Sequence, residues 1–325
     1  MRKCLYCYGE LEETQKDFHP ACCKKFFGTA SAPVLPYSRA DMSELARRII
    51  RVSTSVTGVQ AKMSLDIDKG KKNEPARFSI VGLWGKYIFK PQSSIYPHLP
   101  ELEDVTMKMA KAAGISCAEH SLIRLSDGEI GYITKRMDRD GRGRKKSMLD
   151  FCQLSNRLTE HKYYGTYEQL AQTVKKYSAA PLLDLQRFWE VVLFSWITGN
   201  SDMHCKNFSL IESVDGDYTL SPAYDLLPVL LVDPEDTEEM ALAFTTGGPK
   251  QGFSLDTFTQ AMTASGLRAE IVHRIVHKMI SHYEVWISLI ESSFLSDNFK
   301  QAYKNLLEQR LRTCKASCTG RDWSA

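Results

Sequence analysis

The sequence predicts an α+β protein with two lobes, a smaller strand-rich front lobe and a larger helical back lobe. Strand-like alternation and turn residues dominate up to about residue 140, and apolar residues at helical spacing dominate beyond it. A third observation is a cluster of cysteines within the first 23 residues. We therefore expect a cysteine-rich segment at 1–28, a front lobe at 29–140, a helical lobe at 141–312 and a disordered tail at 313–325.

Composition narrows the class of protein. The chain has 325 residues, of which 43% are apolar and 25% are charged, as is ordinary for a globular protein of about two domains. A net charge of +3 gives no strong signal for nucleic acid or a membrane surface. The N-terminus lacks the apolar stretch of a signal peptide, and no run approaches the roughly 20 apolar residues that span a bilayer. A cytoplasmic location is the expectation.

The front lobe should consist mainly of strands with two helices. A linker rich in proline and small residues at 29–40 precedes the first helix. Apolar spacing predicts helices at 41–52 and 101–115, the second ended by Gly114. Alternating residues predict strands at the end of 53–68 and at 76–82, 86–91, 121–125 and 131–137.

The back lobe should be mostly helical. The pattern predicts helices at 167–177, 182–198 and 269–290, the last with one broad apolar face. Between them, residues 208–226 resemble a hairpin that turns at Asp215, Gly216 and Asp217.

The segment TGNSDMHCKNFSL at 198–210 is polar although it directly follows a strongly apolar helix. Asp202 and Asn207 stand in a D-x-x-x-x-N pattern, and Asp225 follows after the hairpin. Phosphoryl transfer requires a carboxylate beside the attacking hydroxyl and oxygen ligands for Mg²⁺. Asp202 could orient or deprotonate the hydroxyl, while Asn207 and Asp225 could bind the metal.

The front lobe carries residues that fit the same chemistry. Lys90 ends a predicted strand and could reach the phosphates of ATP, with Glu103 on the next helix as its ion-pair partner. Upstream, the backbone near Gly58 and the cation of Lys62 suit a loop that covers phosphates. Each feature alone is common on protein surfaces. Their order along the chain favours a kinase. His204 and Cys205 form a less favoured alternative, a metal-binding pair.

The N-terminal cysteines favour a metal site over disulfides in a reducing compartment. Cys4 and Cys7 form a C-x-x-C pair, and His19 with Cys22 forms an H-x-x-C pair. Four such ligands fit tetrahedral Zn²⁺ in a zinc-knuckle-like segment, with Cys23 as the alternative fourth ligand. The competing interpretation is a set of reduced cysteines without metal.

Several motifs resemble the HipA-like bacterial serine/threonine kinases, the toxins of HipBA-type toxin–antitoxin systems. The motifs are GVQAK, IFKP, KRMDR, GNSDMHCKNFSL and LSPAYDLLP, and the likeness runs from about residue 50 to residue 312. PHLPELEDVTM and YITKRMDRD are particularly similar to HipT, the short kinase form of split HipBST systems. The first 28 residues do not match the kinase core.

The resemblance implies a two-lobed protein-kinase-like fold that uses ATP and Mg²⁺, with Asp202 as the catalytic aspartate and Asn207 and Asp225 as magnesium ligands. It also implies autophosphorylation at Ser55 or Thr57, with Ser53 and Thr54 as rivals. Lys135 stands where the family has an acidic residue, which leaves only a backbone contact to adenine secure. The expected nucleotide-binding residues are Thr57, Gly58, Val59, Gln60, Ala61, Lys62, Lys90, Glu103, Lys135, Met137, Asp138 and His204.

By the same resemblance, the expected function is that of a growth-arresting toxin kinase. Its partners would be a HipB-like DNA-binding antitoxin and a small HipS-like protein, and its substrate an aminoacyl-tRNA synthetase. Direct binding to nucleic acid or to a membrane is not expected. Two alternatives remain open: a lipid or small-molecule kinase on the same fold, and a non-catalytic binding module.

Overall fold

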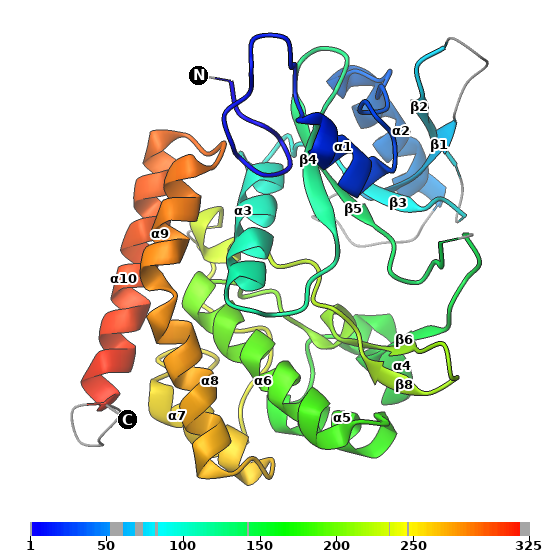
Figure 1. Ribbon diagram of the computed structural model, residues 1–325. Coiled ribbons are helices and arrows are strands. Elements are labelled where there is room, and N and C mark those ends of the chain that lie inside the picture. The colour runs from blue at the N-terminus through cyan, green and yellow to red at the C-terminus, as the bar shows by residue number, and fades with distance from the viewer. Residues whose placement is uncertain are drawn as a thin grey trace. The chain divides into compact units, whose positions relative to one another are not determined.

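The computed structural model describes residues 2–52, 61–68, 74–81, 84–141, 143–233, 235–245 and 247–318. The chain forms two compact units that each contain helices and strands (Figure 1), so the α+β class is confirmed. The first unit comprises Met1–Asp104, Ala118–Arg144 and Ser292–Phe294. The second comprises Val105–Cys117, Lys145–Glu291 and Leu295–Ala325. This division differs from the expected boundaries, because residues 1–28 group with the sheet of the first unit.

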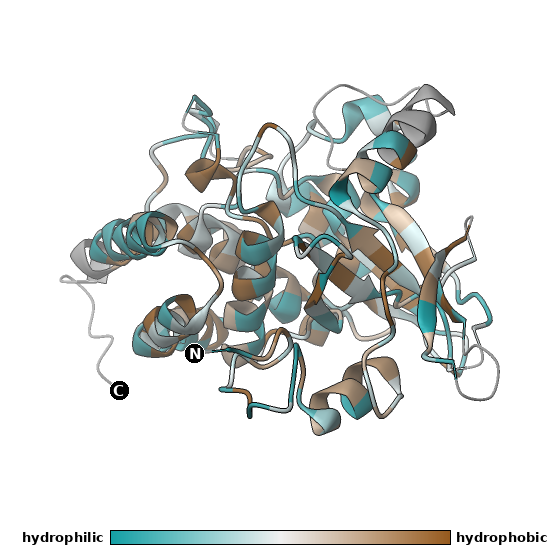
Figure 2. Cartoon of the chain, turned by 90° about the horizontal axis from the view of Figure 1, so that it is seen from above, coloured by the Kyte–Doolittle hydropathy of each residue, from teal (hydrophilic) through white to brown (hydrophobic). Residues whose placement is uncertain are grey.

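An antiparallel sheet forms the centre of the first unit, with strand order β2-β1-β3-β5-β4. Hydrophobic residues recur along its strands (Figure 2). Phe89 of β3 and Leu122 of β4 are fully buried. Lys90 at the end of β3 pairs in register with Tyr132 of β5. The strands are β1 (Met63–Asp68), β2 (Arg77–Ile80), β3 (Tyr87–Lys90), β4 (His120–Arg124) and β5 (Ile130–Lys135).

Among its described residues, three helices begin in the first unit: α1 (Pro20–Phe27), α2 (Arg39–Val52) and α3 (Leu99–Ala112). Helix α1 starts with proline at its first position and ends at Gly28, whose φ of +75° is the left-handed conformation that glycine adopts without strain. Phe26 packs against Tyr87 and Phe27 against Phe78, both on the sheet. The N-terminal segment therefore shares the core of the first unit.

Helices dominate the second unit and surround α6 (Pro181–Thr198), whose residues 188–198 are all buried. A small antiparallel sheet has the order β6-β7-β8, formed by Met148–Asp150, Ser209–Glu212 and Tyr218–Leu220. The other helices are α4 (Phe151–Leu154), α5 (Tyr167–Tyr177), α7 (Leu255–Ala264), α8 (Ala269–Ser281), α9 (Tyr283–Ser292) and α10 (Asp297–Cys318).

Two sequence expectations differ from the structure at the C-terminal end. The single helix expected at 269–290 is broken at His282, whose side chain bonds the carbonyl of Lys278 at 2.6 Å and ends α8. The tail expected from residue 313 is helical up to Cys318, because α10 continues and buries Cys314. Across the described residues, each helix is too short or too polar to cross a bilayer.

Candidate active site and metal centre

The loop after α6 carries Asp202 and Asn207 and is held by its own hydrogen bonds. Gly199 ends the helix with a φ of +75°, and the Asp202 amide donates to Asn200 Oδ1 at 3.2 Å. Asn207 Nδ2 donates to the Asp202 carbonyl at 2.9 Å. This bond uses the amide nitrogen of Asn207, so its oxygen is the atom that could coordinate a cation. The buried helix thus fixes a polar loop whose Asp202 side chain is 46% exposed.

Asp225 lies in the same region of the second unit. The preceding residue, Tyr224, donates its hydroxyl to the Lys206 carbonyl at 2.9 Å and thereby ties the hairpin to the loop. Asp225 has a φ of +55°, a left-handed conformation that is costly for residues other than glycine and is typical of functional sites. The Asp225 carboxylate and the Asn207 amide oxygen are ligand types that Mg²⁺ prefers.

The charges of Asp202 and Asp225 both act on the buried side chain of His204. Burial lowers the pKa of His204 to about 4, although the charges of Asp202 and Asp225 both act to raise it. The imidazole is therefore neutral at pH 7, and its Nδ1 has no hydrogen-bond partner among the described residues. Asp202, His204 and Asn207 lie on one loop, and Asp225 is near enough for its charge to act on the His204 imidazole.

Tyr163 is a site residue that the sequence did not reveal. Its hydroxyl donates to Asp202 Oδ1 at 2.7 Å, and its ring meets that of His204 edge-on with centroids 5.2 Å apart. Burial and the charge of Asp202 raise the pKa of Tyr163, so the phenol stays protonated. A tyrosine 39 positions before its partner leaves no pattern in the sequence.

Lys90 and Glu103 form a buried ion pair in the first unit. Lys90 Nζ lies 2.6 Å from Glu103 Oε1, and the two side chains are only 5% and 2% exposed. The Lys90 ammonium also lies 5.3 Å from the centre of the Tyr132 ring. Desolvated charges are stable only in a well-defined partnership, so this pair has a fixed geometry.

The structure describes only some of the other predicted nucleotide-binding residues. Thr57, Gly58, Val59 and Gln60, together with Ser55, lie outside the described residues, while Ala61 and Lys62 immediately precede β1.

At the end of β5, Lys135 Nζ donates to the Lys25 carbonyl at 3.3 Å and lies over the Phe26 ring, so its side chain contacts α1. Met137 is partly buried. Asp138 pairs with Arg136 and Arg139 at 2.7 Å each; these cations lower its pKa against the opposing effect of burial.

Comparison with known proteins assigns the chain to a family. The sequence profile of the HipA-like C-terminal domain matches residues 54–287, which is more than half of the chain. The chain belongs to the HipA-like family. The matched range includes Lys90, Glu103, Asp202, Asn207 and Asp225.

Individual relatives are distant. A Haemophilus influenzae protein whose name classes it as a kinase is 28% identical over 61% of this chain and 59% of its own length. The serine/threonine-protein kinase toxin HipA of Shewanella oneidensis is 27% identical over 58% of this chain and 46% of its own length. These matches span about half to three fifths of the relatives' lengths.

A solved structure shares the fold. It is that of the Shewanella oneidensis MR-1 toxin–antitoxin complex of HipA, HipB and operator DNA. The match has a TM-score of 0.67 and 20% sequence identity, and it covers 91% of this chain and 78% of the other. The α+β architecture of this HipA-like chain is thus shared with HipA.

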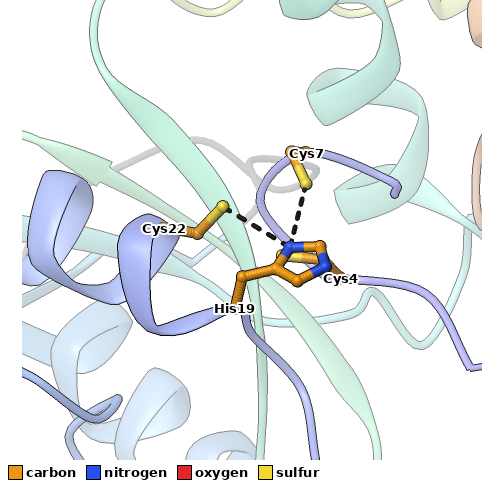
Figure 3. A group of neighbouring side chains, drawn as sticks. All are labelled: Cys4, Cys7, His19 and Cys22. Atoms are coloured by element: carbon orange, nitrogen blue, oxygen red, sulfur yellow. Dashed lines mark hydrogen bonds between the residues drawn. The ribbon is translucent and has the colours of Figure 1, made fainter. Parts of the chain in front are cut away.

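A cysteine and histidine cluster precedes the region that matches the family. The ligand atoms of Cys4, Cys7, His19 and Cys22 all lie within 4.8 Å of one another (Figure 3), whereas Cys23 is buried outside this group. His19 Nδ1 lies 3.4 Å from Cys7 Sγ, while its Nε2 bonds the Glu10 carbonyl at 2.9 Å. A carbonyl on one ring nitrogen is the usual partner of a histidine that binds metal through the other. The donor set and its orientation fit Zn²⁺.

Proposed function

We propose that this chain is a serine/threonine protein kinase that uses ATP and Mg²⁺. The observation that carries the proposal is the grouping of Asp202, Asn207 and Asp225 around the neutral His204, with Asp202 left half-exposed. Family membership supports it, because relatives of the HipA-like family are named as kinases.

Each group has a role in this proposal. Asp202 orients the substrate hydroxyl and accepts its proton, and Asn207 and Asp225 would hold magnesium through their oxygen atoms. Bound Mg²⁺ would neutralise charge on the phosphates. Lys90, held by Glu103, contacts the phosphates, and residues 57–62 cover them. Lys135 through its backbone, with Met137 and Asp138, lines the adenine and ribose side.

We propose further that the kinase is a toxin of a HipBA- or HipBST-like system in the cytoplasm. Support comes from the toxin name of the Shewanella relative and from the HipB and DNA in the related complex. The partners would be a HipB-like antitoxin and a small HipS-like protein, and the substrate an aminoacyl-tRNA synthetase. Ser55 or Thr57 would be autophosphorylated, and the added charge of about −2 would then prevent the loop from covering ATP.

The N-terminal cluster is proposed to hold a structural Zn²⁺ through Cys4, Cys7, His19 and Cys22. The grouping of four donor atoms within 4.8 Å and the hydrogen bond from His19 to the Glu10 carbonyl support this assignment. Zinc would stabilise the first unit and take no part in phosphoryl transfer.

The test of the kinase proposal is incubation of the purified chain with Mg·ATP, followed by intact mass and peptide mapping beside an Asp202→Asn control. A gain of about 80 Da per phosphate on Ser55 or Thr57, absent from the control, is the expected result. If neither the chain, nor added aminoacyl-tRNA synthetases, nor lipid and small-molecule alcohols gain phosphate, kinase function is contradicted. Transfer only to a lipid or small alcohol would favour that alternative substrate class.

A further inference from the structure

Tyr8 stands at the turn of the cysteine knuckle and has an unusual backbone. It directly follows Cys7 and has a φ of +64°, a left-handed conformation that is strained for a tyrosine. Two short backbone bonds hold the turn: the Tyr8 amide donates to the Cys4 carbonyl at 2.9 Å, and the Cys4 amide to the Gly9 carbonyl at 2.8 Å. A metal bound by the flanking cysteines would therefore lock this conformation and the direction of the Tyr8 side chain.

The Tyr8 side chain reaches helix α3. It is 5% exposed, and its hydroxyl donates to Asp104 Oδ2 at 2.5 Å. The other oxygen of this fully buried carboxylate, Oδ1, lies 2.7 Å from His120 Nδ1 on β4. Asp104 is thus attached to the knuckle by one oxygen and to the sheet by the other. Loss of either hydrogen bond should be costly, because it takes a donor away from a fully buried carboxylate.

The same network continues to the ion pair of the candidate active site. Asp104 is the neighbour of Glu103 on a rigid helix, so the attachment of Asp104 fixes the rotation of α3 and with it the position of Glu103. The His120 ring stacks on Tyr132 with centroids 5.7 Å apart, and the Lys90 ammonium faces that same ring. Tyr8, Asp104 and His120 therefore connect the cysteine cluster to both members of the ion pair.

We infer that Tyr8 and Asp104 are positioning residues that couple zinc binding at the knuckle to the geometry of the Lys90–Glu103 pair. A chain with zinc in place holds Glu103 against Lys90, and a chain without zinc loses the anchor of Tyr8 and loosens the start of α3. The effect on catalysis rests on the proposed kinase function, whereas the effect on α3 does not.

The deciding experiment compares the full-length chain with Tyr8→Phe and Tyr6→Phe variants. Tyr6 is the matched control, because it lies in the same knuckle but donates to Glu119 instead of Asp104. Zinc content, hydrogen exchange of α3 and phosphoryl transfer are measured on each. We expect one zinc per chain in all three. In Tyr8→Phe alone, exchange in α3 should rise at least about tenfold, the loss expected for a hydrogen bond to a charged group. Exchange in α5 should not change, and kcat should fall by a similar factor.

A second arm tests whether zinc acts through Tyr8. Cys7→Ser should abolish zinc binding and raise hydrogen exchange in α3 as much as Tyr8→Phe does. The double variant Cys7→Ser, Tyr8→Phe should exchange less than about twofold faster than either single variant, because coupled changes are not additive. Four results would each overturn the inference. They are wild-type exchange in zinc-loaded Tyr8→Phe, equal effects of Tyr8→Phe and Tyr6→Phe, multiplicative effects in the double variant, and no bound zinc. Absence of phosphoryl transfer with the expected exchange pattern would instead contradict the proposed kinase function.

Discussion

The two sets of groups proposed to act on ATP differ in their exposure to water. The Lys90 and Glu103 side chains in the first unit are 5% and 2% exposed and lie 2.6 Å apart. Asp202 in the second unit is 46% exposed and is approached by the hydroxyl of Tyr163. A buried ion pair keeps its geometry because separation would leave each charge desolvated. A half-exposed carboxylate can accept a substrate. Burial thus accompanies positioning, and exposure accompanies contact with the reacting group.

The largest effect is expected at the exposed member of this comparison. Asp202→Asn should lower kcat by about 10²- to 10⁴-fold, because an amide cannot accept the proton of the substrate hydroxyl. Its free energy of unfolding should change by no more than about 0.5 kcal/mol, as for other partly exposed sites. Steady-state kinetics and urea denaturation measure the two quantities. Asp215→Asn, at the exposed turn of the hairpin, should change neither.

The buried pair should respond in the opposite way, with a large loss of stability. Lys90→Met removes the cation that faces the buried Glu103 carboxylate, so the free energy of unfolding should fall by about 3–5 kcal/mol. The double variant Lys90→Met, Glu103→Met should regain most of that stability because apolar side chains replace both charges. It should remain inactive. Full activity in the double variant would show that the pair has no role in phosphoryl transfer.

Tyr163 should have a smaller effect that is confined to Asp202. Tyr163→Phe removes the donor to the carboxylate, and kcat should fall by about threefold to tenfold, the value of one hydrogen bond. The KM for ATP should stay unchanged, because Tyr163 contacts neither proposed metal ligand through a described hydrogen bond. Tyr164→Phe, at the exposed neighbour, is the control. Equal kinetics of Tyr163→Phe and wild type would contradict a role in orienting Asp202.

The smallest effect is expected at the pair of partly exposed His98 and buried Glu101 near the start of α3. His98 Nδ1 lies 3.5 Å from Glu101 Oε1, and the interaction with this carboxylate raises the pKa of His98 above its ordinary 6.5 against the effect of burial. A raised folded-state pKa contributes stability that is present below pH 6.5 and is lost as pH rises through the folded-state value.

The free energy of unfolding should therefore fall by no more than about 1 kcal/mol over that range as pH rises. His98→Asn, which tolerates the positive φ of this position, should remove that part of the pH dependence. Urea denaturation at several pH values measures it, and an unchanged slope in the variant would contradict the assignment.

Local patterns in the sequence were sufficient to predict most helices and strands, including the elements that carry Lys90 and Glu103. The bounds of α5 agree with the prediction, and the expected strand ending in Lys90 and helix carrying Glu103 are both present. The contacts of Tyr163 with Asp202 and of Tyr8 with Asp104 were not predictable, because they join residues 39 and 96 positions apart. The break at His282 was also hidden, since the apolar face of α8 continues into α9 through the buried Trp286. Tertiary packing decides such features, and they leave no hydrophobic periodicity in the sequence.

Binding of Mg·ATP, measured by titration calorimetry on the wild type and on two variants, tests the central assignment most directly. Asp202→Asn should bind Mg·ATP about as tightly as the wild type and fail to transfer phosphate, because the carboxylate acts on the hydroxyl. Asp225→Asn should lose the magnesium-dependent part of the affinity, because it removes a metal ligand. If the wild type does not bind Mg·ATP, or if both variants lose affinity equally, the separation of these roles is wrong.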